Sequence, residues 1–150
     1  MLLNLTGSTK ANRDIATTAA VFAMMELGLT RLSSLDIDIA FKNLGEGSYG
    51  LCSVAETENS GRNKPMRSFI IEVNKTMNIS MIVRTVLHEM VHVRQFARGQ
   101  LDTTVNPKGI RWKSAHVNDD TVDYMDLPWE KEAHKLEEKL AAKFWSANLV

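Results

Sequence analysis

Two histidines and a glutamate form a motif whose spacing points to metal chemistry. His88, Glu89 and His92 occupy the pattern H-E-x-x-H. In a helix, imidazoles four residues apart lie on one face and can bind the same zinc ion. Glu89 flanks that face, where it can accept a proton from a water that zinc has made more acidic. The motif therefore predicts zinc-dependent hydrolysis, with His88 and His92 as metal ligands and Glu89 as the general base.

A catalytic zinc usually has three protein ligands and a water, so a third ligand must come from elsewhere in the chain. One large class has a third histidine six residues after the second, but position 98 is an arginine. The remaining candidates are His116, Asp119, Asp120, Asp123, Glu130, Glu132 and His134. On a helix, Glu130 and Glu132 flank opposite sides of the apolar stripe, so periodicity does not choose between them. His134 lies four residues after Glu130, where it could hydrogen-bond near the metal.

Composition restricts the kinds of site that this chain can build. It has 150 residues, four His, one Cys and a formal net charge of zero. A single Cys excludes the Cys-rich zinc scaffolds. The balanced charge argues against nucleic-acid binding driven by a large basic surface, although a local basic patch remains compatible with it. We expect one domain over residues 1–150, with no membrane span, in the cytoplasm.

The elements before the motif are expected to be one helix and three strands. Residues 12–27 are rich in Ala and Met and are typical of a helix. Residues 35–41 alternate between apolar and polar or small side chains, as a half-buried strand does. Residues 51–57 form a weaker strand candidate, and residues 68–74 have the β-branched content of a third strand. These segments predict an N-terminal helix followed by a small three-stranded sheet.

The elements that carry the motif and follow it are expected to be mainly helical. Asn78 or Ser80 can cap a helix over residues 81–98. Residues 110–113 and 122–125 could pair as an irregular hairpin. Pro128 suits the first turn of a final helix, on whose outside we expect Glu137, Glu138, Lys139 and Lys143. Helix, strands, helix, hairpin and helix make an α+β order, without βαβ alternation.

Several segments of the second half together resemble a known family. They are His88 to Gln95, Gly99, Trp112-Lys113 and the run Leu127-Pro128-Trp129-Glu130-Lys131-Glu132-Ala133-His134. They are similar to the small SprT-like and minigluzincin-type zinc metallopeptidases, many of which bacteriophages encode, and the similarity covers about residues 69–144. The resemblance implies a zincin-like fold. It also implies that Glu130 is the third zinc ligand, with His134 beside it in the ligand's supporting shell.

The resemblance also implies where a substrate would bind. The strand before the metal helix would run along the cleft as an edge strand and pair with an extended peptide. That strand supplies Phe69, Ile70, Ile71, Glu72 and Val73, although it could equally be a plain core strand. For stabilising the oxyanion we rank Tyr124 first, ahead of His116 and His134.

The sequence thus predicts a zinc-dependent metallopeptidase acting on peptides or proteins. The alternative is a non-catalytic, zinc-stabilised binding module that docks to DNA-bound proteins. A third hypothesis is a latent peptidase in which residues 99–127 or a terminus cover the cleft. Arg84, Arg94 and Arg98 are expected to form a solvated helix face, so nucleic acid is a partner that the charge does not support.

Overall fold

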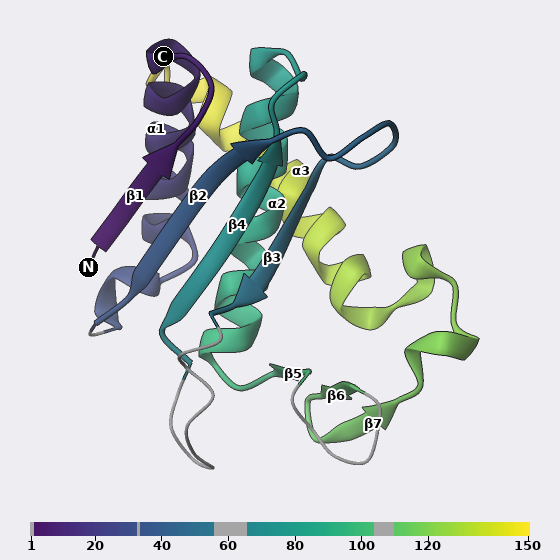
Figure 1. The fold of residues 1–150 in the computed structure, drawn as a ribbon. Helices are drawn as coiled ribbons and strands as arrows, with labels where there is room; N and C mark the ends of the chain where they lie inside the picture. The colour runs from purple at the N-terminus through teal and green to yellow at the C-terminus, as the bar shows by residue number, and fades with distance from the viewer. Residues whose placement is uncertain (1, 33, 56–65, 104–109) are drawn as a thin grey trace.

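The main sheet of the protein is mixed and has four strands. The structure, a computed structural model, describes residues 2–32, 34–55, 66–103 and 110–150. The strand order is β1 (Leu2–Thr6), β2 (Asp36–Lys42), β4 (Ser68–Asn74) and β3 (Gly50–Val54) (Figure 1). β1, β2 and β4 are parallel, and β3 is antiparallel to β4.

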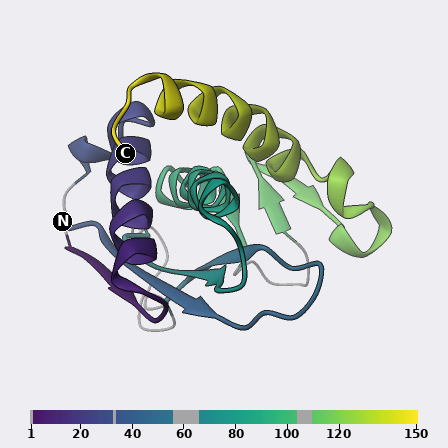
Figure 2. The same ribbon diagram turned by 90° about the horizontal axis from the view of Figure 1, so that it is seen from above.

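Three helices lie on one side of this sheet (Figure 2). They are α1 (Lys10–Glu26), α2 (Ile79–Ala97) and α3 (Pro128–Ser146), with α3 packed on α2. Seen from above, α2 lies in the centre, with the sheet on one side and α3 on the other (Figure 2). Alternate strand side chains, such as Ile39 and Ile71, are buried against the helices, whereas Asp38 and Ile70 on the opposite face are exposed. No helix among the described residues is long and apolar enough to cross a membrane.

The central position of α2 explains why its polar residues are buried. The Asn78 side chain accepts a hydrogen bond from the Met81 amide at 2.9 Å, which caps the first turn. From Thr85 to Val93 every residue of α2 is buried, because α1, α3 and the sheet surround the helix. The H-E-x-x-H motif therefore lies on a helix whose polar side chains need partners from the surrounding elements.

A small antiparallel sheet and two short 3-10 helices follow α2. The strands are β5 (Leu101–Asp102), β6 (Ile110–Trp112) and β7 (Ala115–Val117), and the 3-10 helices are η3 (Asp119–Thr121) and η4 (Tyr124–Asp126). Lys113 and Ser114, both with positive φ, make a two-residue turn between β6 and β7. This turn makes residues 115–117 the partner of β6, so the predicted pairing of 110–113 with 122–125 is wrong.

The α+β class is confirmed, but two features of the sheet differ from the prediction. The sheet has a fourth strand, β1, which pairs in parallel with β2 and makes a β-α-β unit with α1. β1 has only five residues, and an apolar residue, Leu2, occupies one of its exposed positions with 67% of its surface accessible. The sequence of β1 therefore lacks the clear alternation of a half-buried strand. The strand predicted over residues 51–57 is β3, which ends at Val54. Residues 56 and 57 of the predicted range lie outside the described residues.

The prediction that residues 68–74 form an edge strand is wrong. β4 pairs with β2 on one side and with β3 on the other, so its backbone groups are already used in the sheet. Phe69, Ile71 and Val73 point into the core instead of a cleft. The strand at the edge of the sheet is β3.

Candidate metal centre

Two helices bring the predicted ligands together. His88 and His92 lie one turn apart on α2, on the side that packs against α3. α3 begins at Pro128, whose fixed φ suits the first helical turn, and this start places Glu130 opposite the two imidazoles. All three residues are buried.

The carboxylate of Glu130 spans both histidines. Its Oε1 lies 3.1 Å from His88 Nε2, and its Oε2 lies 3.1 Å from His92 Nε2. Two imidazole nitrogens and a carboxylate that converge in this way are a donor set typical of three-ligand zinc sites. The residues therefore fit a divalent metal ion, and the chemistry of the donors favours zinc while leaving other divalent ions compatible.

Each imidazole is held through its second nitrogen. His88 Nδ1 lies 2.8 Å from Glu137 Oε1, and His92 Nδ1 lies 2.8 Å from Gln95 Oε1. The Gln95 amide nitrogen in turn donates to the Trp129 carbonyl oxygen at 3.0 Å and to Glu132 at 3.1 Å. If each Nδ1 carries the proton, each Nε2 has its lone pair free toward Glu130, which is the tautomer that a metal ligand needs.

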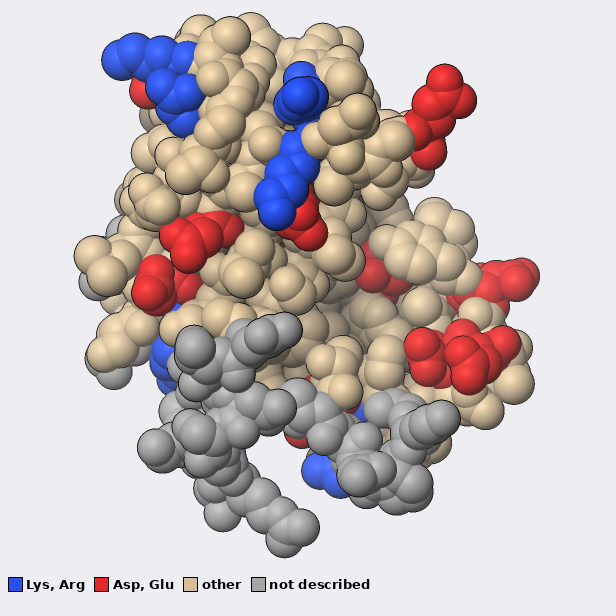
Figure 3. Space-filling model, in the orientation of Figure 1, with Lys and Arg blue, Asp and Glu red and all other residues tan. Residues whose placement is uncertain are grey.

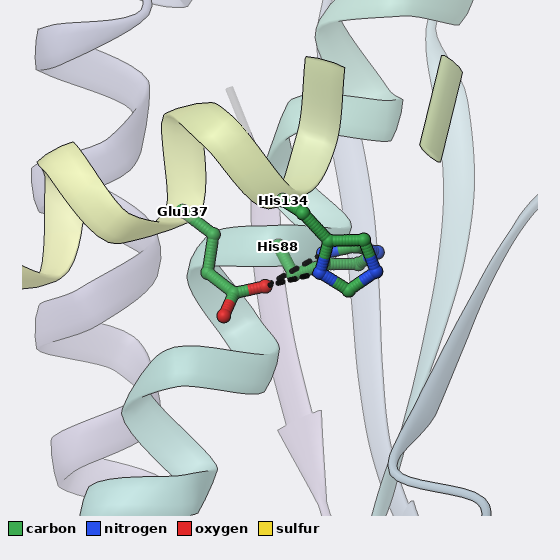
Figure 4. A group of neighbouring side chains, drawn as sticks. All are labelled: His88, His134 and Glu137. Atoms are coloured by element: carbon green, nitrogen blue, oxygen red, sulfur yellow. Dashed lines mark hydrogen bonds and ion pairs between the residues drawn. The ribbon is translucent and has the colours of Figure 1, made fainter. Parts of the chain in front are cut away.

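A second group of possible ligands shares His88 with the first. Glu137 Oε1 contacts the Nδ1 atoms of both His88 and His134, the latter at 3.3 Å (Figure 4). The other oxygen of Glu137 accepts a hydrogen bond from Arg84 Nε. Because this guanidinium already neutralises the carboxylate, the second group suits the orientation of His88 better than the binding of a cation.

The charges of the centre shift the pKa values in directions that fit a cation site. Burial disfavours the charged form of His88, but the hydrogen bonds that its ring donates to the Glu130 and Glu137 carboxylates outweigh burial and raise its pKa to about 10. Burial would also raise the pKa of Glu130, but hydrogen bonds from His88 and His92 outweigh it and lower that pKa. The metal-free centre thus holds protons on imidazole in the place where a metal ion would supply positive charge.

Glu89 lies beside the two imidazoles, and its carboxylate is left without a polar partner by the described residues. It is 5% exposed, and it forms no hydrogen bond or ion pair with any described residue. Burial, the largest cause, raises the pKa of its carboxyl group. Gly50 lies against this side chain, because a Cβ on Gly50 would come within 3.3 Å of Glu89 Oε1 and 2.6 Å of Thr85. The absence of a side chain at position 50 keeps space open next to Glu89.

An open cleft reaches the centre. It has a volume of about 610 Å³, and its walls include Tyr49 and Gly50 on one side, Arg84 and His88 on α2, and Tyr124 on η4. A smaller hollow of about 180 Å³ continues past Glu89, His92 and Glu130. Glu89 and Tyr124 line both spaces, so the potential metal ligands are accessible from the cleft.

Tyr124, the residue ranked first from the sequence for stabilising an oxyanion, lines the cleft. Partial burial, together with the nearby negative charge of Glu130, raises the pKa of its phenol. The hydroxyl therefore stays protonated and remains a donor at the mouth of the centre. His134 also lines the cleft, and its buried Nε2 atom has no hydrogen-bond partner among the described residues.

Most of the other residues considered as ligands do not join the convergent donors of this centre. Glu132 contacts Gln95, Arg94 and Lys113. Neither group of potential metal ligands within the described part of the chain includes His116, Asp119, Asp120 or Asp123. His134 lies nearer, because it belongs to the second group, where it contacts Glu137 and its ring lies 4.6 Å from that of His88.

Three residues that matter at the centre were assigned other roles from the sequence. Glu137 was expected on the outside of the final helix, yet it is buried. Its position seven residues after Glu130, two helical turns along, was the available signal. Arg84 does not belong to a solvated basic face, because it pairs with Glu137, while Arg98 donates to the Leu27 carbonyl oxygen. Gln95 enters the sequence prediction only as one residue of the segments that carry the family resemblance, and its contact with His92 shows its role.

Comparison with known proteins adds no relative to this picture. The sequence matches no family model, and neither the curated proteins nor the solved structures contain a significant match to it. The family resemblance of the second half therefore stays a prediction, and the function must be argued from the geometry of the centre.

Proposed function

We propose that this protein is a zinc-dependent metallopeptidase with His88, His92 and Glu130 as ligands. One observation carries the proposal: a buried, unpaired Glu89 lies beside a convergent His-His-Glu set that an open cleft reaches. A structural centre needs neither an unpaired carboxylate nor access from solvent, whereas a hydrolytic centre needs both.

The side chains around the cleft divide the chemistry among them. A divalent ion bound here would polarise a substrate carbonyl and make water more acidic. Glu89 accepts the proton from water, and its raised pKa lets it pass that proton on to the leaving amine. The Tyr124 hydroxyl, as a donor at the cleft mouth, stabilises negative charge that develops on the carbonyl oxygen. Glu137 and Gln95 hold the imidazoles in orientation.

An extended peptide would pair with β3, not with β4 as expected from the sequence. Tyr49 and Ala55 flank β3 and bond to β4 through Tyr49 O and Ala55 N, so alternation turns the backbone groups of Gly50, Cys52 and Val54 away from β4. Gly50 lies next to Glu89, which would place a peptide on this edge across the cleft. Pairing of this kind gives affinity through main-chain hydrogen bonds.

The test compares wild type with Glu89→Gln after loading both with zinc. We expect each to hold one zinc per chain, because Glu89 is not a ligand. Cleavage of an unstructured polypeptide, followed by mass spectrometry, should fall by about 10²–10⁴-fold in the variant. Glu138→Gln, an exposed substitution on α3, is the matched control and should cleave as wild type does. Equal cleavage by wild type and Glu89→Gln would exclude this mechanism.

The alternative of a non-catalytic binding module predicts a different coordination. A structural zinc is closed by four protein ligands. Neither group of potential ligands in the described ranges has a fourth His, Cys, Asp or Glu. The nearby Cys52 is absent from both groups, and burial, with Glu89 close by, raises the pKa of its thiol. These observations favour the peptidase over the module.

A further inference from the structure

We infer that the cleft binds basic polypeptide segments, with Lys or Arg side chains next to the bond that is cleaved. This inference rests on the proposed peptidase function and names its substrate class. It starts from an acidic segment, residues 119–126, which contains Asp119, Asp120, Asp123 and Asp126 and covers η3 and η4.

The charges of the acidic segment are not balanced locally. All four carboxylates are exposed, and none forms an ion pair with a described residue. The chain has no Lys or Arg between Lys113 and Lys131, although its overall net charge is zero. Acids elsewhere, such as Asp14 with Lys10 and Glu26 with Lys143, do have basic partners. In Figure 3 the right-hand side of the molecule shows acidic side chains without a basic one among them.

The acidic segment forms part of the cleft wall. Tyr124 and Met125, which lie between Asp123 and Asp126, line the cleft. Across the cleft, the exposed Glu46 directly precedes Gly47, another lining residue. A chain that occupies the cleft would therefore pass between acidic side chains on both rims.

The floor of the cleft points to a ligand independently of the rim. Glu89 is 5% exposed and lines the cleft, and its carboxylate has no polar partner within the described ranges. With a divalent ion bound, the floor is close to neutral, because the ion and Arg84 offset the negative charges of Glu89, Glu130 and Glu137. The unbalanced charge that a substrate meets therefore comes from the acidic segment and Glu46.

The arrangement of the four aspartates suits a mobile cationic partner better than a bound metal ion. None of them belongs to a group of potential metal ligands among the residues described. Separated, exposed carboxylates attract flexible Lys and Arg side chains and repel polyanions and acidic chains. This attraction acts through solvent, so it should weaken as salt increases.

The experiment separates substrate class from catalysis by measuring binding and turnover in parallel. Three fluorescent peptides share one scaffold and carry three Lys, three Gln or three Glu around the same central residues. Their binding to zinc-loaded Glu89→Gln is followed by anisotropy, which needs no turnover, and their cleavage by wild type gives kcat/KM. Both are measured at about 0.02 and 0.3 M NaCl, where the Debye length falls severalfold.

A variant and a matched control locate the effect. The variant D119N/D120N/D123N/D126N neutralises the acidic segment, and D14N/E26Q/D36N/D38N removes four acids from α1 and β2. We expect the Lys peptide to bind about tenfold more tightly than the Glu peptide at low salt, with the difference shrinking at high salt. The acidic-segment variant should lose most of this preference and keep its affinity for the Gln peptide, whereas the control should keep the preference. Thermal unfolding verifies that both variants are folded.

Each outcome decides one of the two proposals. A wild-type protein without preference for the Lys peptide, or a preference that salt leaves unchanged, overturns the inference even if a variant does not fold. A preference that survives in the folded acidic-segment variant also overturns it. Preferential binding of the Lys peptide without any cleavage by wild type would support the inference about the partner and reject the peptidase.

Discussion

Glu130 and Glu137 lie two turns apart on α3, and both touch His88, but from opposite edges of its ring. Glu130 contacts the Nε2 atoms of His88 and His92, and Glu137 contacts the Nδ1 atoms of His88 and His134. Both carboxylates are buried. What separates them is their other partner, because Glu137 is paired with Arg84, while the ion pairs of Glu130 among the described residues are with imidazoles alone.

This difference assigns the two carboxylates different roles. A buried carboxylate needs a compensating charge, and Arg84 supplies one to Glu137 without any metal. Glu130 obtains compensation only when the imidazoles hold protons or when a cation binds between them. The comparison therefore predicts that the metal lies at Glu130 and that Glu137 acts through His88.

Replacing Glu130 should produce the largest effect on metal binding. A four-ligand zinc site gains about 10–16 kcal/mol, so one ligand contributes enough to change the affinity by at least about 100-fold. We expect Glu130→Gln to weaken zinc binding by this factor in a chelator competition. Glu132→Gln, which removes the rival acid, should bind zinc nearly as wild type does. The reverse pattern would move the third ligand to Glu132.

Acidity should weaken metal binding by at least about 100-fold between pH 8 and pH 6, because the pKa values of both His88 and His92 are raised. The pKa of His88 in the metal-free protein is about 10, so a metal ion must displace its proton throughout this range. One displaced proton changes the affinity about tenfold per pH unit, with tighter binding at higher pH. Calorimetry in buffers of different ionisation enthalpy counts the released protons, and a count of zero at pH 7 would contradict the assignment.

In the metal-free protein, the raised pKa of His88 makes folding stability fall as the pH rises, whereas metal affinity increases with pH. Folding raises the pKa of His88 above its ordinary value, because the protonated ring contacts the Glu130 and Glu137 carboxylates. These contacts stabilise the protein fully below about pH 6.5, and their contribution is lost as the pH rises toward 10. Denaturation of the metal-free protein across this range should therefore show its stability falling, whereas zinc-loaded protein should lose less.

Replacing Glu137 should weaken zinc binding by about 10–100-fold, which is less than the loss of a ligand. Glu137→Gln keeps the size of the side chain but removes the charge that holds His88 Nδ1 and Arg84. Chelator competition measures the affinity, and Glu138→Gln is the exposed control on the same helix. Complete loss of zinc binding in a folded Glu137→Gln protein would place the metal in the second group.

The smallest change is expected for Gln95, which is neutral and holds His92. Gln95→Met removes the hydrogen bonds to His92 Nδ1 and to the Trp129 carbonyl oxygen, yet it keeps much of the buried volume. We expect zinc affinity to fall by about tenfold or less. The unpartnered carbonyl should lower the free energy of unfolding by about 1–3 kcal/mol, which urea denaturation measures. If Gln95→Met weakens zinc binding more than Glu137→Gln does, the charge of the residue that holds an imidazole does not determine its contribution to zinc affinity.

The sequence alone determined what is local along the chain. Helical spacing placed His88, Glu89 and His92 on one helix, and the ranges predicted for α1 and α2 agree with the structure to within two residues. Pro128 marked the start of α3. These features could be predicted because capping, periodicity and proline geometry act over a few residues.

The tertiary structure decided which separated segments meet. Only the packing of α3 on α2 distinguishes Glu130 from Glu132 and turns Glu137 inward, since both sides of the helix carry acids. Only the strand order makes β3 the edge strand, and only the turn at Lys113 and Ser114 determines the partner of β6. Pairing and burial depend on contacts between segments far apart in sequence, which the local pattern of residues does not encode.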